Sequence, residues 1–258
     1  MVHSIGRSTL SFVQALGDLA LFIGQSFRAA LGSRKLFRRV VRAMFEQGVR
    51  CVPVILIVGM FTGLVLGLQG YYVLNRFGSE SLLGTLVSLS IVRELGPVLA
   101  ALMLVGQAGS ALAAELGIQR NTEQIAALET MGVSSHGYLV APRLIASLFV
   151  YPMQTALFCC IGLWGGSVSG SMLLGLEPGI YWSAVERAVE LADVRECMIK
   201  ALTFGLLTVA LCAYHGFNAH RNRASTGARA VSASTTRAVV QSSIIVLAAD
   251  YVITSFLI

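Results

Sequence analysis

Residues 90–143 read SIVRELGPVLAALMLVGQAGSALAAELGIQRNTEQIAALETMGVSSHGYLVAPR, and this stretch decides the fold. It opens with an Arg-Glu pair and a proline inside an apolar run, becomes a short charged amphipathic segment, and returns to apolar sequence after Pro142-Arg143. Charged residues inside a membrane-length run are costly, so they usually mark a pathway or a buried partner. A short amphipathic helix between two such runs is suited to docking a soluble protein. The stretch predicts a membrane-embedded transport subunit that another protein drives.

The composition of the whole chain agrees with a membrane protein. Of the 258 residues, 55% are hydrophobic and only 12% are charged, against about 25% in soluble domains, and the mean hydropathy is +0.75. The net charge of +6 does not indicate nucleic acid, because the basic residues lie beside apolar spans and form no separate basic domain with stacking aromatics. We expect an all-α integral membrane protein whose loop charges fix its orientation.

Five apolar stretches reach the roughly 20 residues that a membrane helix needs. They run over 51–74, 81–116, 138–174, 198–217 and 239–258. The second and third exceed that length and are expected to tilt, kink or protrude, with Pro97 as the evident kink. Lys and Arg are concentrated in alternate connections, which predicts a cytoplasmic N-terminus and a periplasmic C-terminus.

Residues 8–31, before the first span, are only moderately apolar, and their apolar positions recur at helical spacing. An amphipathic segment followed by basic residues is typical of a helix lying in the membrane interface. The alternative is a sixth, poorly apolar span. The basic cluster that follows comprises Arg34, Lys35, Arg38, Arg39, Arg42 and Arg50.

Arg93 and Glu94 lie about 18 Å along the second span if that helix starts near Ser81 and rises by about 1.5 Å per residue. Because adjacent residues on a helix point in different directions, the two side chains do not face each other. In one interpretation, one or both border a cavity that holds a polar head group; in the other, they tie two helices together. Asp250 in the last span has Lys200 as a candidate partner, for which a structural role is the favoured interpretation.

Residues 121–132 carry the signals of one short helix. Asn121 is placed to cap it, Gln124 occupies the third helical position as in a capping box, and Gly132 suits its C-terminal stop. The segment is too short to span a bilayer and falls in a connection expected to be cytoplasmic. It is interpreted as a coupling helix that fits a groove of an ATPase, with a solvated turn as the alternative. Its apolar stripe comprises Ile125, Leu128 and Met131.

Glycine recurs at every fourth position in two spans, which lets helix backbones approach closely. Packing within one chain and packing across a dimer are equally good interpretations. The first strip comprises Gly59, Gly63 and Gly67, and the second comprises Gly162, Gly166 and Gly170.

No motif argues for chemistry in this chain. The sequence contains no G-x-x-x-x-G-K-[ST], no H-E-x-x-H and no G-x-S-x-G. Its five cysteines lie mostly in or beside apolar runs, and no Cys/His spacing suits zinc. We therefore expect a non-enzymatic chain without a metal or cofactor of its own.

The run RELGPVLAALMLVGQAGSALAAELG…EQIAALETMG…PR resembles the MlaE permease family. These are the membrane subunits of bacterial ABC transporters that move phospholipid between the inner and outer membranes and maintain outer-membrane lipid asymmetry. Further agreements are GLVLGLQGYYVL at 63–74, IGLWGGSVSG at 161–170 and SASTTRAVVQSSIIVLAADYVITSF at 232–256. The resemblance covers nearly the whole chain and implies a single permease domain over 1–258.

The resemblance also implies partners. The family forms inner-membrane homodimers with an N-terminal interfacial helix and five membrane helices per subunit. Separate ATPase subunits, which bind ATP and Mg, dock on the cytoplasmic loop between the second and third spans. A periplasmic hexamer of the MCE type and a STAS-domain protein bound to the ATPase complete the assembly, and phospholipid occupies an outward-open cavity between the two permease subunits.

By position, the family's lipid-facing residues fall on Leu66, Gln69, Val73, Leu74, Phe77, Arg93, Glu94 and Leu95. The candidate ATPase contacts around the predicted coupling helix are Glu115, Arg120, Glu123, Gln124 and Glu129. The chain departs from the family at Gln107, where arginine is usual, and in the altered glycine-rich motif STGARAVSAS at 225–234. Two other classes stay open: a membrane scaffold that anchors an ATPase complex without passing substrate, and a membrane-embedded enzyme, which the lack of a catalytic constellation disfavours.

Overall fold

The computed structural model describes residues 14, 17–29, 36–219 and 227–257, and within these ranges it is helical, with no strand. Five helical segments are long and apolar enough to cross a membrane, which confirms the all-α fold class and makes the chain a multi-pass membrane protein. These segments run over Leu36–Asn75, Glu80–Asn121, His136–Met172, Leu191–Phe217 and Ala228–Phe256.

The first three segments are built from several consecutive helical pieces. The first comprises α2 (Leu36–Gln47), the short turn η1 (Val49–Cys51) and α3 (Val52–Asn75). The second comprises η2 (Glu80–Leu82), α4 (Leu83–Ser90), η3 (Ile91–Leu95), α5 (Gly96–Leu104), η4 (Val105–Gly109) and α6 (Ser110–Asn121). The third comprises η5 (His136–Val140), α8 (Ala141–Val168) and η6 (Ser169–Leu173).

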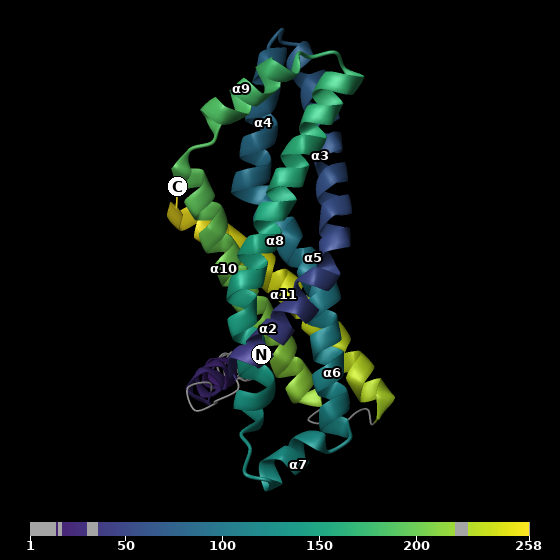
Figure 1. Ribbon diagram of the computed structural model, residues 1–258, viewed down its shortest axis with the longest axis vertical. Coiled ribbons are helices and arrows are strands. Elements are labelled where there is room, and N and C mark those ends of the chain that lie inside the picture. Colours follow the sequence, from purple (N-terminus) through teal and green to yellow (C-terminus); the bar gives the residue numbers. More distant parts are fainter. Residues whose placement is uncertain (1–13, 15–16, 30–35, 220–226, 258) are drawn as a thin grey trace, which may run out of the picture.

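The last two long segments are the single helices α10 (Leu191–Phe217) and α11 (Ala228–Leu257). Two short helices, α7 (Gln124–Thr130) and α9 (Pro178–Ala188), lie at opposite ends of an elongated bundle (Figure 1). The long helices begin earlier than the apolar windows at 198 and 239 because helical structure continues through polar residues. Glu190 and Asp193, for example, form the capping box that starts α10.

The two glycine strips pack α3 against α8 within one chain. A Cβ added at Gly63 would overlap the carbonyl oxygen of Gly162, and one added at Gly165 would lie 2.5 Å from the carbonyl oxygen of Met60. Backbone therefore lies directly against backbone, as the spacing allows. Of the two interpretations, the structure shows the contact within the chain. Gly170 instead lies beside Leu83, the first residue of α4.

The helix over 17–29 packs at the α7 end of the bundle (Figure 1). Phe22 is buried there against the rings of both His136 and Phe217, with centroid distances of 5.1 and 5.7 Å. At about 1.5 Å per residue the described part of this helix is about 20 Å long, which is shorter than a membrane span. The remainder of the predicted interfacial segment, and Arg34 and Lys35 after it, lie outside the described residues.

Candidate functional site

The second span is interrupted by a wide π-helical turn, η3, that contains both Arg93 and Glu94. Pro97 lies two residues after the end of this turn and explains the break, because proline has no backbone N–H to donate to the carbonyl four residues earlier, and its ring crowds that carbonyl. That carbonyl belongs to Arg93, and it accepts a hydrogen bond from Lys200 Nζ at 2.8 Å instead. Single wide turns of this kind are frequent at functional sites.

Lys200 lies at the centre of a cluster of charges contributed by three helices. Its ammonium is 3.0 Å from Glu94 Oε1 and 3.3 Å from Asp250 Oδ1, and the Lys200 side chain is 2% exposed. Thr254 Oγ1 donates to the same Glu94 oxygen at 3.3 Å. The candidate partnership between Asp250 and Lys200 is therefore present in the structure, and Glu94 joins it.

Arg93 pairs with a different residue of α10. Its Nε lies 2.7 Å from Asp193 Oδ1, and the other carboxylate oxygen of Asp193 accepts the backbone N–H of Glu190 at 3.0 Å. As the sequence predicted, Arg93 and Glu94 do not pair with each other. Both interpretations of these residues retain support: each ties η3 to α10, yet the side chains remain 50% and 44% exposed, so a polar group can still reach them.

The candidate lipid contacts on α3 are divided between two faces of that helix. Gln69 and Val73 are exposed and lie four residues apart, so they share one face of the helix, and Phe77 is exposed in the turn that follows α3. Leu66 and Leu74 are partly buried and pack on the cluster around Leu83. The exposed face with Gln69 and Val73, here called the α3 face, is therefore apolar except for the amide of Gln69.

One chain does not bring the α3 face together with Arg93 and Glu94. No hydrogen bond or ion pair joins the two groups within the described ranges, and the side chains of Arg93 and Glu94 contact α10 and α11. α8 packs against both α10 and α3 and runs between them (Figure 1). Leu95 is half-buried in η3.

The short helix between the second and third spans starts later than predicted. Asn121 ends α6 and does not cap α7, so the predicted capping box is wrong. The reason is Glu123, whose φ of 58° turns the chain between the two helices and leaves Gln124 as the first residue of α7. Gly132, with a φ of 73°, supplies the expected stop.

The exposed face of α7 carries most of its predicted ATPase contacts. Glu123 and Gln124 are exposed, whereas Ile125 is fully buried and anchors the helix to the bundle. Glu129 accepts a hydrogen bond from Ser135 Oγ at 2.8 Å and so holds the turn after α7. Of the predicted stripe, Met131 is exposed rather than packed.

The other two predicted ATPase contacts are engaged within the chain. Arg120 lies over the ring of Phe217, with its guanidinium carbon 5.4 Å from the ring centroid. Glu115 pairs with Arg143 at 2.6 Å and also accepts a hydrogen bond from Gln119 at 3.1 Å.

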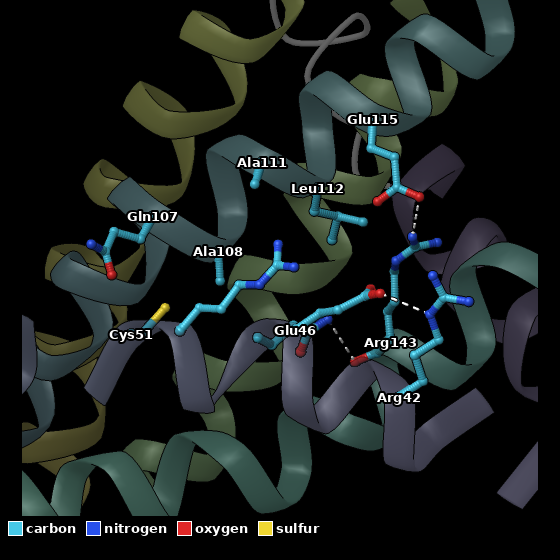
Figure 2. A pocket seen from close by; sticks show the side chains of 11 residues that line it. Arg42, Glu46, Cys51, Gln107, Ala108, Ala111, Leu112, Glu115 and Arg143 are labelled. Atoms are coloured by element: carbon cyan, nitrogen blue, oxygen red, sulfur yellow. Dashed lines mark hydrogen bonds and ion pairs between the residues drawn. The ribbon is translucent and has the colours of Figure 1, made fainter. Parts of the chain in front are cut away.

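Glu115 borders a cavity of about 480 Å³ between α2, α6 and the start of α8 (Figure 2). Arg42, Glu46, Glu115 and Arg143 meet on one side of it, and Gln107 and Cys51 lie on the other. The remaining lining residues are Gln47, Arg50, Ala108, Ala111 and Leu112.

The sequence matches the family model described as Permease MlaE over residues 40–256. The chain belongs to the MlaE permease family. The intermembrane phospholipid transport system permease protein MlaE of Haemophilus influenzae is 37% identical over 99% of this chain and 97% of its own length. A probable ABC transporter permease protein of Rickettsia bellii is 35% identical over 98% of the chain and 96% of its own length. The chloroplastic protein TRIGALACTOSYLDIACYLGLYCEROL 1 of Arabidopsis thaliana is 29% identical over 93% of the chain and 67% of its own length.

Sequence reasoning on this MlaE-family chain missed the cavity. The basic cluster at 34–50 was interpreted as orientation charge and as the flank of an interfacial helix, although Glu46 lies four residues after Arg42 and pairs with it at 2.9 Å. That spacing was a signal for a helical ion pair. Nothing in the sequence indicated that Arg143, almost a hundred residues later, closes the same cavity.

Proposed function

We propose that this MlaE-family chain is the membrane-spanning subunit of an ATP-driven transporter that moves phospholipid between the inner and outer membranes of a bacterium. The observation that carries the proposal is the accessibility of Arg93 and Glu94 in the middle of a span. Charge at that depth is costly, so a span that keeps it half-exposed is best explained by a polar ligand that reaches it. A phospholipid head group is such a ligand.

The acyl chains of the lipid would lie along the exposed face of α3, where Val73 is accessible, and beside Phe77 in the turn that follows. An amphiphile needs this apolar face and the charged wide turn in one cavity, and a single chain keeps them apart. A homodimer, in which the α3 face of one copy lies opposite the wide turn of the other, would unite them. Phospholipid fits this pair of surfaces better than an ion or a sugar does.

The driving ATPase would dock on α7, because Glu123 and Gln124 are exposed there while Ile125 fixes the helix to the bundle. ATP and Mg would be bound by that partner, since this chain has no phosphate-binding loop. The family resemblance supports the remaining partners, a periplasmic MCE hexamer and a STAS-domain protein. The proposed setting is the inner membrane, with the N-terminus cytoplasmic and the C-terminus periplasmic.

Photo-crosslinking in the intact complex tests the lipid path. A photoreactive residue at Val73 should capture phospholipid, whereas one at the neighbouring Leu74, which packs on the Leu83 cluster, should capture less. Val73→Glu should abolish lipid transfer in proteoliposomes without loss of the protein, because it puts a carboxylate on the exposed face of α3 that is proposed to hold the acyl chains. Normal transfer by Val73→Glu, with crosslinks confined to Tyr72 on another face, would place the cavity elsewhere.

A charge reversal on α7 tests the ATPase contact. Glu123→Lys with Glu129→Lys should release the ATPase while the permease still inserts and dimerises. Since Glu129 also holds Ser135, the variant Ser135→Ala separates loss of that hydrogen bond from loss of the docking surface. If the double variant keeps the ATPase and its normal rate of ATP hydrolysis, α7 is not the docking site. If the complex keeps the ATPase but transfers no lipid, the chain is better explained as a scaffold that anchors the ATPase without passing substrate.

Reporter fusions test the topology. Fusions at residue 185, in α9, and at the C-terminus should report the periplasm, and a fusion at residue 225 should report the cytoplasm. A cytoplasmic C-terminal reporter would remove the proposed orientation.

A further inference from the structure

The cavity between α2, α6 and α8 has one cation more than its own carboxylates neutralise. Arg42 pairs with Glu46 at 2.9 Å and Arg143 pairs with Glu115 at 2.6 Å, so these four side chains cancel in charge. Arg50 also lines the cavity and has no ion-pair partner among the residues that the structure describes. The cavity therefore carries a net charge of one positive unit, which complements a single negative charge such as that of a phosphodiester.

A second, independent observation is a buried amide without a full set of partners. Gln47 lines the same cavity and is only 5% exposed. Its Nε2 donates to the carbonyl oxygen of Arg143 at 3.5 Å, whereas its Oε1 is buried and receives no hydrogen bond. A buried acceptor left unsatisfied is unfavourable, so this oxygen favours a ligand that brings an N–H or O–H donor.

The position of the cavity along the bundle matches the depth of lipid head groups. Cys51, in its lining, directly precedes α3, and the 24 residues of α3 extend about 36 Å, more than the roughly 30 Å of a hydrocarbon core. The cavity thus lies near the membrane boundary at the α7 end. On α2 beside it, Phe37 and Phe45 are exposed, as expected for side chains that reach into the acyl region.

We propose that this cavity binds the head group of a phospholipid from the leaflet at the α7 end. The phosphodiester contacts the Arg50 guanidinium, and an ammonium or hydroxyl of the head group donates to Gln47 Oε1. Ala108, Ala111 and Leu112 supply the apolar part of the lining. A choline head group has no N–H or O–H donor, so ethanolamine and glycerol head groups should bind in preference to choline.

This site is separate from the proposed transport path on α3 and at the wide turn. A chain that only anchored an ATPase would bind lipid here equally well, so the test uses binding rather than transport. Failure of the binding test leaves the transport proposal standing, and failure of transport leaves this site standing.

The experiment is native mass spectrometry of the full-length chain in a neutral detergent, with phosphatidylethanolamine or phosphatidylcholine of identical acyl chains added in titration. We expect the wild-type protein to retain the ethanolamine lipid more tightly, and Arg50→Gln to weaken its retention about tenfold through loss of a charge-assisted hydrogen bond. Gln47→Leu, which fills the same space without an acceptor, should remove the preference between the two lipids while both remain bound. The control, Arg38→Gln, removes the same charge from an exposed position of α2 outside the cavity lining.

Three results would overturn the assignment. The first is equal retention of both lipids by the wild-type protein, and the second is an effect of Arg38→Gln as large as that of Arg50→Gln. The third is displacement of bound lipid by micromolar glycerophosphoethanolamine, which would assign the cavity to soluble phosphodiesters rather than to lipid. Circular dichroism of each variant shows whether it is folded; if Arg50→Gln is not, Arg50→Lys, which keeps the charge without the fork of donors, should show a smaller loss.

Discussion

The chain contains two clusters of charge that differ in how completely it satisfies them. At the wide turn, Lys200 is enclosed by two carboxylates and a backbone carbonyl. In the cavity near α7, Arg50 has no ion-pair partner in the described part of the chain, and Arg42, in its ion pair, has a side chain that is 82% exposed. The difference shows that the buried Lys200 holds three helices together, while Glu94 beside it stays 44% exposed to the proposed head group. In the second cluster the cation itself is open to a ligand.

The largest expected effect comes from removing the buried cation. Lys200→Met leaves Glu94 and Asp250 facing each other without a counter-charge, and loss of one member of a buried ion pair costs about 3–5 kcal/mol of unfolding free energy. The measurement is denaturant unfolding in mixed micelles. Adding Glu94→Gln and Asp250→Asn to the same variant should recover most of the loss, and if it does not, the cluster is not held by charge.

A smaller effect is expected at the other ion pair of the wide turn. Arg93→Met deprives the buried Asp193 carboxylate of its partner, although Asp193 keeps its hydrogen bond from the Glu190 N–H. We expect a loss of about 1–3 kcal/mol, the range for leaving a buried polar group unsatisfied. The control is Arg195→Met, at an exposed position of α10, the helix that carries Asp193; this variant should unfold like the wild type. Equal losses in both variants would mean that the Arg93 pair contributes nothing specific.

An intermediate loss of stability is expected when the buried arginine of the cavity, Arg143, is replaced. The Arg143 side chain is 13% exposed, and it donates to the carbonyl oxygen of Leu139 at 2.8 Å as well as pairing with Glu115. Arg143→Met should cost about 1–2 kcal/mol in the same unfolding measurement, because Glu115 on the other side stays accessible to water. A loss as large as that of Lys200→Met would make the cavity a second closed cluster and remove the contrast.

The smallest effect is expected at Arg42. Its pair with Glu46 is solvent-exposed and lies within one helix, so Arg42→Ala should leave the unfolding midpoint unchanged within error. A measurable loss of stability in Arg42→Ala would show that water is excluded from the cavity in the folded protein. The claim that the second cluster is open to a ligand would then be refuted.

The sequence predicted the features that depend on local pattern. The five spans, the break at Pro97, the stop at Gly132 and the separation of Arg93 from Glu94 all follow from hydropathy, proline chemistry or helical spacing. The predicted start of α7 was wrong because no clear signal in the sequence indicates that Glu123 adopts a left-handed backbone conformation.

Long-range partners were harder to predict. That Lys200 contacts both Glu94 and Asp250 depends on how three spans pack, and spacing along the chain carries no information on that. The same holds for the cavity, whose lining comes from three segments. One pairing, Lys200 with Asp250, was accessible to reasoning because isolated opposite charges in apolar spans have few alternatives.

The contact between the glycine strips has a mechanical consequence. With no side chains between Gly63 and Gly162, α3 and α8 cannot slide past each other without backbone atoms colliding, so they move as one rigid unit. Contacts between η3 and α10 are made by long side chains, which can change rotamer while helices shift. If this protein changes shape during its work, the displacement should occur along the boundary between η3 and α10, and the distance between α3 and α8 should stay constant.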